Sequence, residues 1–130
     1  MAEYDEARRL LFAAYRDLRA LQGMTDALVF ADEIFGFHAQ QAAEKALKAW
    51  LALLGVEYPK THDITLLLSM LTAHGQSVDS LYDLIEFNPY AVQLRYEAFD
   101  EVGEPLQRDA VIARVGELVR KVQALIGRAG

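Results

Sequence analysis

The spacing of apolar residues along the chain is typical of amphipathic α-helices. Near both ends of the chain, apolar residues recur at alternating steps of four and three. Because an α-helix has about 3.6 residues per turn, this spacing places the apolar side chains on one face of each helix. The two stripes are Ala7, Leu11, Ala14, Leu18 and Leu21, and Val111, Val115, Leu118, Val122 and Leu125.

A second, long helix is predicted from near Asp26 to Leu54. Thr25 and Asp26 are suitable N-terminal caps, and Gly55 is suited to the left-handed position that ends many helices. The middle of this segment is rich in alanine, whose small side chain lets neighbouring helices approach closely. We therefore expect this helix to be the central element of the domain.

A connector with a proline inside it follows from Val56 to Asp63. Thr61 or Asp63 is a suitable cap for a third helix, and Gly75 is a suitable end. The sequence thus predicts a short helix between these residues.

The remaining capping residues and prolines predict two further helices and a short helical piece between them. One begins at Ser77 or Asp79 and stops at Pro89, because the residue before a proline is pushed toward extended geometry. A short helical piece is expected over 90–99, and the last helix begins near Pro105. No useful strand-like alternation occurs, so the predicted fold is an all-α, up-and-down bundle of about five helices.

Composition limits the class of protein. A chain of 130 residues predicts a single domain, residues 1–130. It has no cysteine, which excludes disulfides, thiolate metal sites and cysteine nucleophiles. The first twenty residues mix arginines with acids and resemble neither a signal peptide nor a membrane span. We expect a soluble, cytoplasmic protein that makes no membrane contact.

Charge is distributed unevenly. The formal net charge is −6, which argues against a broad duplex DNA surface. Between Thr61 and Gln107 there are eight acidic residues, and Arg95 is the one Lys or Arg. Arg95 either neutralises nearby carboxylates or binds an anion such as phosphate. Tyr96 beside it either stacks on a base or packs in the core.

A small basic cluster is predicted in the middle of the chain, from Lys45, Lys48 and Lys60. Glu44 and Lys48 are four residues apart with the acid first, which is the favourable order for a surface pair. With Gln41, these residues are expected to form a solvated helix face. A modest phosphate site is the alternative use of the lysines.

The three histidines have different settings. His38 lies on an apolar stripe and is expected to be buried and hydrogen-bonded between helices, whereas His74 suits a helix C-terminus. His62 stands at a predicted helix start, where free amides attract anions, and with Lys60 it is a candidate phosphate contact. Neither Glu-x-x-His nor His-x-x-x-His occurs, nor does a phosphate-binding glycine loop. No metal site and no cofactor are therefore expected.

Two segments resemble the HEPN domain family, helical domains found in prokaryotes and higher eukaryotes. They are FHAQQAAEKALKAWLALL from Phe37 to Leu54 and GVEYPKTHDITLLL from Gly55 to Leu68. The resemblance implies a bundle of about five helices that usually forms a homodimer. It also implies a gene beside a small nucleotidyltransferase, as in toxin–antitoxin systems, and a nucleotide or RNA ligand.

Some HEPN proteins are metal-independent ribonucleases, whose arginine is followed four to six residues later by histidine. After Arg95 those positions hold Phe99, Asp100 and Glu101. The pair Arg95–Tyr96 instead resembles that of the nonnuclease, nucleotide-binding branch. The resemblance therefore favours a noncatalytic protein that binds nucleotide or RNA.

Two alternatives stay open at this point. In the first, the protein is a ribonuclease in which His62 or His38 replaces the missing histidine. In the second, it is a purely structural module whose helix faces bind another protein.

Overall fold

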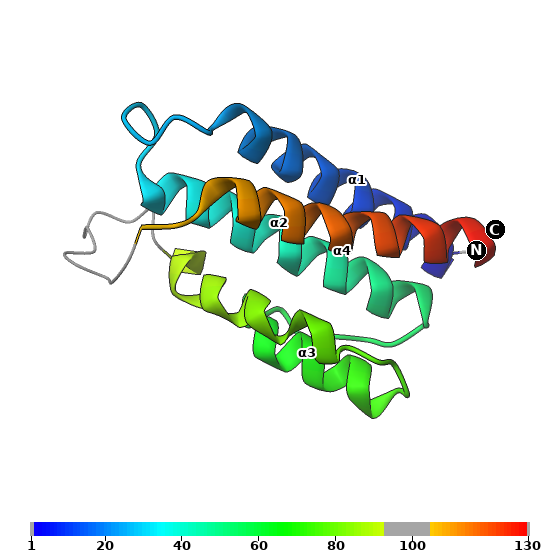
Figure 1. Ribbon diagram of the computed structural model, residues 1–130. Helices are drawn as coiled ribbons and strands as arrows, with labels where there is room; N and C mark the ends of the chain where they lie inside the picture. The colour runs from blue at the N-terminus through cyan, green and yellow to red at the C-terminus, as the bar shows by residue number, and fades with distance from the viewer. Residues whose placement is uncertain (1, 93–104, 130) are drawn as a thin grey trace.

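The computed structural model describes residues 2–92 and 105–129, and Figure 1 shows how their helices are arranged. All the regular elements in these two ranges are helices, which confirms the predicted all-α bundle. They are α1 (Ala2–Gly23), α2 (Asp32–Leu53), α3 (Ile64–Ala73), the 3₁₀ helix η1 (Asp79–Val92) and α4 (Arg108–Ala129). None of them is long and apolar enough to span a membrane.

Helix α2 is the centre of the bundle, as its alanines predicted. It contacts each of the other four helices. In Figure 1, α1 lies above α2 and α4 passes in front of it, while α3 and η1 lie below. The small side chains that permit this close packing are fully buried: Ala39, Ala42, Ala43, Ala46 and Ala49.

The apolar stripes of the first and last helices also pack as predicted. Most of their members are buried, and Leu11 and Leu125 are half-buried. The caps of α3 are likewise as expected, since Asp63 is its N-cap and accepts a hydrogen bond from the Thr65 amide. Gly55 and Gly75 follow α2 and α3 with φ angles of 74° and 82°, the left-handed region that favours glycine.

Helix α2 begins at Asp32, so the prediction of a start near Asp26 is wrong. The Asp26 side chain accepts from the Leu28 amide at 2.9 Å, which stabilises a local turn. The N-cap position is Ala31, and no side chain of the described residues forms a capping hydrogen bond there. Asp26 has a side chain suited to capping, but it stabilises a turn before the helix and does not mark the start of α2.

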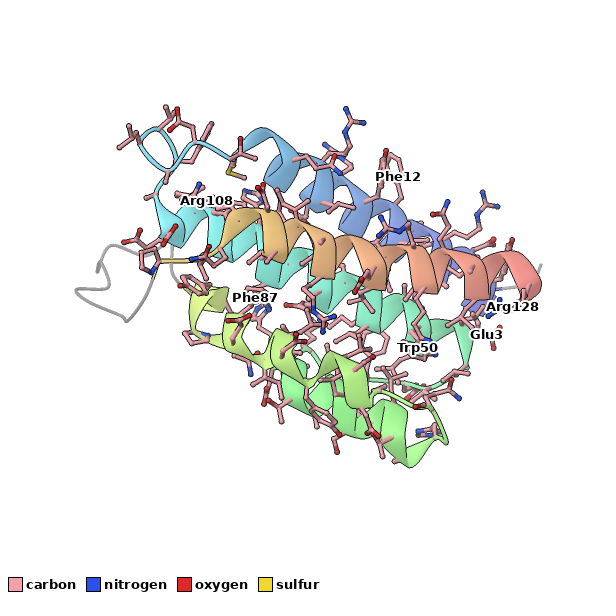
Figure 2. All side chains as sticks on the ribbon, viewed as in Figure 1. Glu3, Phe12, Trp50, Phe87, Arg108 and Arg128 are labelled. Carbon is pink, nitrogen blue, oxygen red and sulfur yellow. The ribbon has the colours of Figure 1, made fainter. Side chains whose placement is uncertain are left out.

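Arg108, at the start of α4, ties the loop before α2 to the rest of the bundle (Figure 2). Its guanidinium donates to the carbonyl oxygens of Met24 and Phe30 at 2.8 and 2.7 Å, and to Asp32 Oδ1 at 2.6 Å. The same group lies 4.7 Å from the centroid of the Phe35 ring. These contacts hold the α1–α2 loop in a non-helical course and give the physical reason for the later start of α2.

The prediction that Pro89 ends the fourth helix is also wrong, because η1 continues through it to Val92. The buried side chains Leu81, Leu84 and Phe87 recur every third residue. A 3₁₀ helix has three residues per turn, so this spacing puts all three on one face toward the core. The expected helical piece over 90–99 is described only as far as Val92, and the remainder lies outside the described residues.

Candidate functional site

Glu44 is a buried carboxylate in the middle of α2, with only 4% of its surface exposed. Lys48 Nζ donates to its Oε2 at 2.7 Å, and Gln40 Nε2 and His62 Nδ1 lie 2.9 Å from its Oε1. The predicted pair with Lys48 exists, but the interpretation as a solvated helix face is wrong for Glu44. The connector between α2 and α3 returns along α2 and helps to cover this side chain.

The hydrogen bonds around Glu44 keep it ionised. Burial on its own raises the pKa of the carboxyl, but the bonds from Lys48, Gln40 and His62 together hold that pKa below its ordinary value of 4.5. An ionised carboxylate only accepts hydrogen bonds. His62 Nδ1 therefore carries a hydrogen and donates it to Glu44.

His62 is held at its backbone as well as at its ring. Gln40 Nε2 donates to the His62 carbonyl oxygen at 3.0 Å, which fixes the end of the connector against α2. Nevertheless, 62% of the His62 side chain is exposed. With Nδ1 committed to Glu44, Nε2 is an acceptor in the neutral ring and a second donor in the protonated ring. The site thus presents an imidazole of fixed orientation to solvent.

The predicted basic cluster of Lys45, Lys48 and Lys60 is divided in the structure. Lys48 belongs to the Glu44 site, and its Nζ also lies 5.7 Å from the centroid of the Tyr58 ring. Lys45 instead pairs with Asp17 of α1 at 2.8 Å. Lys60 is exposed, and within the described residues it has no hydrogen bond or ion pair.

His38 contacts Asp17 of α1 and is not part of the Glu44 site. Its Nδ1 lies 2.9 Å from Asp17 Oδ1, and the side chain is about one-third exposed. The expectation of a hydrogen-bonded histidine between helices is correct, although burial is only partial. His74 caps the end of α3 and its Nδ1 contacts the Met70 carbonyl oxygen, as a residue at a helix C-terminus can.

Two amides at the start of α3 donate to side chains of the protein itself. The Thr65 amide donates to Asp63 Oδ1, and the Ile64 amide donates to Asn88 Oδ1, each at 2.9 Å. Asn88 Nδ2 in turn donates to Asp63 Oδ1 at 3.0 Å. Capping by Asp63, which the sequence also predicted, therefore accounts for the Thr65 amide, and a phosphate contact at this terminus stays a prediction. His62 and Lys60 remain candidates through their side chains.

Two partners in this region escaped the sequence interpretation. Gln40 is fully buried and connects Glu44 to the His62 backbone, and Asn88 connects η1 to the start of α3. The sequence did contain a signal for Gln40, because it is a polar residue inside an alanine-rich stretch, four positions before Glu44. The predictions for Arg95 and Tyr96 fall outside the described residues.

Comparison with known proteins gives the family. The model of the HEPN domain matches residues 7–125, nearly the whole chain. Neither the curated proteins nor the solved structures contain a match. The match includes the Glu44 site, the connector and all five helices of the described residues in whole or in part. The chain therefore belongs to the HEPN domain family.

Proposed function

We propose that this chain is a noncatalytic HEPN protein that binds a nucleotide or the end of an RNA strand. The observation that carries the proposal is the Glu44–His62 contact, in which a buried carboxylate orients an exposed imidazole. When the ring is protonated, Nε2 donates to a phosphate oxygen, and Lys60 adds positive charge two residues away. Family membership supports the same ligand class. Arg95 and Tyr96 resemble a nucleotide-binding pair of the family and are included in the proposal as two further ligand contacts.

The lysines of α2 have a supporting role in this proposal. Lys48 neutralises Glu44, so the buried carboxylate does not repel an approaching phosphate. Lys45 neutralises Asp17 in the same way. Both lysines thus contribute to phosphate binding chiefly by balancing the acids beneath the surface.

Calorimetry with nucleoside mono-, di- and triphosphates tests the site. His62→Ala and Arg95→Ala should each weaken binding about tenfold or more, because a hydrogen bond to a charged group contributes roughly 1.5–3 kcal/mol. His74→Ala is the matched control, since His74 is also exposed but belongs to the end of α3. Equal affinity in wild type, His62→Ala and Arg95→Ala would remove the site assignment.

The proposed function includes a nucleotidyltransferase partner and a homodimer, as parts of a toxin–antitoxin-like system. Light scattering tests the dimer, because the chain mass is 14.6 kDa and a dimer has twice that mass. Co-expression with the product of a neighbouring nucleotidyltransferase gene tests the partner. A 14.6 kDa species alone would contradict the dimer. Separate elution of the two proteins would contradict the partner.

The same Glu44–His62 contact favours one second candidate, a metal-independent ribonuclease with a displaced histidine. A carboxylate that fixes the tautomer of histidine leaves the opposite ring nitrogen suited to proton transfer. RNA incubated with the protein in EDTA should then be cleaved, and His62→Ala should abolish cleavage while His38→Ala does not. Intact RNA, together with normal growth on expression, would reject this candidate.

A further inference from the structure

The outer face of α1 carries arginine and aromatic side chains side by side. At about 100° per residue, Arg8, Phe12, Tyr15 and Arg19 lie within an arc of roughly 60°. All four are exposed, including 63% of Phe12 and 44% of Tyr15. Phe12 points away from the bundle on the outer side of α1 (Figure 2). With the exposed neighbour Arg16, these residues are named here the outer α1 face.

Among the described residues of α1, arginines outnumber acids on this face. Within the described residues, the four arginines of α1, at positions 8, 9, 16 and 19, form no ion pair. Glu6 and Asp17 of the same helix lie on a different side, where Glu6 accepts from Tyr58 and Asp17 accepts from Lys45. Asp5 lies at the N-terminal end of the face, so positive charge dominates from Arg8 to Arg19.

The arginines stack on aromatic rings of their own helix. The guanidinium carbon of Arg8 lies 5.6 Å from the centroid of the Tyr4 ring, and that of Arg19 lies 5.9 Å from the Tyr15 ring. Between Arg8 and Arg19, flat aromatic rings and flat guanidinium groups therefore lie close together along about 16 Å of helix. Unpaired bases stack on both kinds of group, while the cations attract the phosphates between them.

We propose that the outer α1 face binds single-stranded nucleic acid. A duplex fits the face less well, because paired bases cannot stack on Phe12 and Tyr15. Two-fold pairing of two copies through this face would bring arginine against arginine. A membrane surface fits less well too, since the continuous apolar stripe of α1 is buried in the core. This surface is separate from the His62 site, and the inference does not depend on nucleotide binding there.

Fluorescence anisotropy with labelled 12-nucleotide strands tests the proposal, using oligo-U RNA, oligo-dT DNA and a 12-base-pair duplex as probes. The wild type should bind both single strands more tightly than the duplex. Phe12→Ala/Tyr15→Ala should weaken strand binding about fivefold or more, since stacking of one base is worth roughly 1–3 kcal/mol. Arg120→Ala/Arg128→Ala on α4 is the matched control for charge, and its affinity should stay within about twofold of wild type.

Salt dependence tests the arginines separately. Single strands lose about 0.7 in the slope of log affinity against log salt for each phosphate contact. The three arginines of the face, Arg8, Arg16 and Arg19, thus predict a slope near −2.1, and Arg8→Ala/Arg19→Ala should reduce it to about −0.7. Both α1 variants alter exposed side chains, so an unchanged melting temperature confirms that they remain folded.

Three results would overturn the inference: no strand binding at 50 mM salt, equal binding by the α1 variants and wild type, or tighter binding to the duplex. Binding of the wild type to anionic vesicles but not to strands would assign the face to a membrane. Self-association lost in the α1 variants, without strand binding, would assign it to a second copy. Failure of the His62 proposal can be distinguished from failure of this inference. If only the His62 proposal fails, His62→Ala leaves nucleotide and strand binding unchanged, while the α1 variants still weaken strand binding.

Discussion

Gly36 of α2 lies directly beneath the ring of Tyr90 in η1. A Cβ atom at residue 36 would approach Tyr90 Cδ1 to 2.5 Å, a distance that real Cβ atoms essentially never show. Gly36 is buried, and the ring of Tyr90 is part of the apolar packing around the core. The two helices therefore meet at a point where only a hydrogen atom fits.

The first prediction is that Gly36→Ala destabilises the protein. The added methyl group forces the Tyr90 ring to move, and overpacking of this kind costs roughly 1–3 kcal/mol. Urea denaturation should show this loss in the free energy of unfolding. Gly127→Ala is the control, because no atom of the described residues outside the helix backbone and the chain neighbours lies within 4 Å of a Cβ there. The control should be neutral or slightly stabilising, so an equal effect of both substitutions would contradict the contact.

The second prediction concerns Arg108. Arg108→Lys keeps the charge but has a single nitrogen for the bonds that now reach Met24, Phe30 and Asp32. We expect a loss of about 2 kcal/mol in the free energy of unfolding. Hydrogen exchange should also become faster in the α1–α2 loop. Arg120→Lys, on the exposed side of α4, should leave both measurements unchanged.

A large part of the fold could be predicted from local sequence. The four-three stripes, the Asp63 cap and the two glycines with positive φ depend on residues close in the chain. The start of α2 depends instead on Arg108, more than seventy residues after the loop that it holds. The end of η1 was not predicted, because a proline usually stops an α-helix, whereas the 3₁₀ helix η1 continues through Pro89.

The candidate site was predictable by residue type but not by environment. His62 and Lys48 were both singled out, yet Glu44 was expected on a solvated face. Glu44 is buried because the connector returns along α2. The spacing of residues within a helix does not predict the course of the loop that follows it. Packing of η1 against α3 likewise brings Asn88 to the start of α3, where it accepts from the Ile64 amide, and local sequence does not show this contact.

The third prediction links the Glu44 site to pH. Because the folded-state pKa of Glu44 is lowered, its stabilising effect is present above the unfolded value near 4.5. That effect is lost as the pH falls through the lower folded pKa. The unfolding free energy of Glu44→Gln should therefore lie below that of wild type at pH 7, by roughly 1–3 kcal/mol. The difference should shrink in acid below about pH 4.5.

Glu57→Gln provides the control for this pH dependence. Glu57 is an exposed carboxylate of the connector and has no hydrogen bond or ion pair within the described residues. Its variant should follow the wild-type stability curve from pH 3 to pH 7 within about 0.5 kcal/mol, as surface substitutions usually do. A Glu44→Gln curve that also follows wild type would show that the buried carboxylate contributes nothing to stability.

The last prediction separates the two roles of Asn88. Asn88→Ala leaves the buried Ile64 amide without its acceptor and should cost about 1–2 kcal/mol, as loss of a helix cap does. Asn88→Asp retains an acceptor for that amide but places a second carboxylate against Asp63, in place of the amide that now donates to it. Repulsion between the two acids should destabilise this variant at pH 7, and protonation should relieve it near pH 4. Thermal melts at both pH values measure the difference. Recovery in acid by Asn88→Asp but not by Asn88→Ala is the expected result, whereas the same deficit at both pH values would contradict the contact with Asp63.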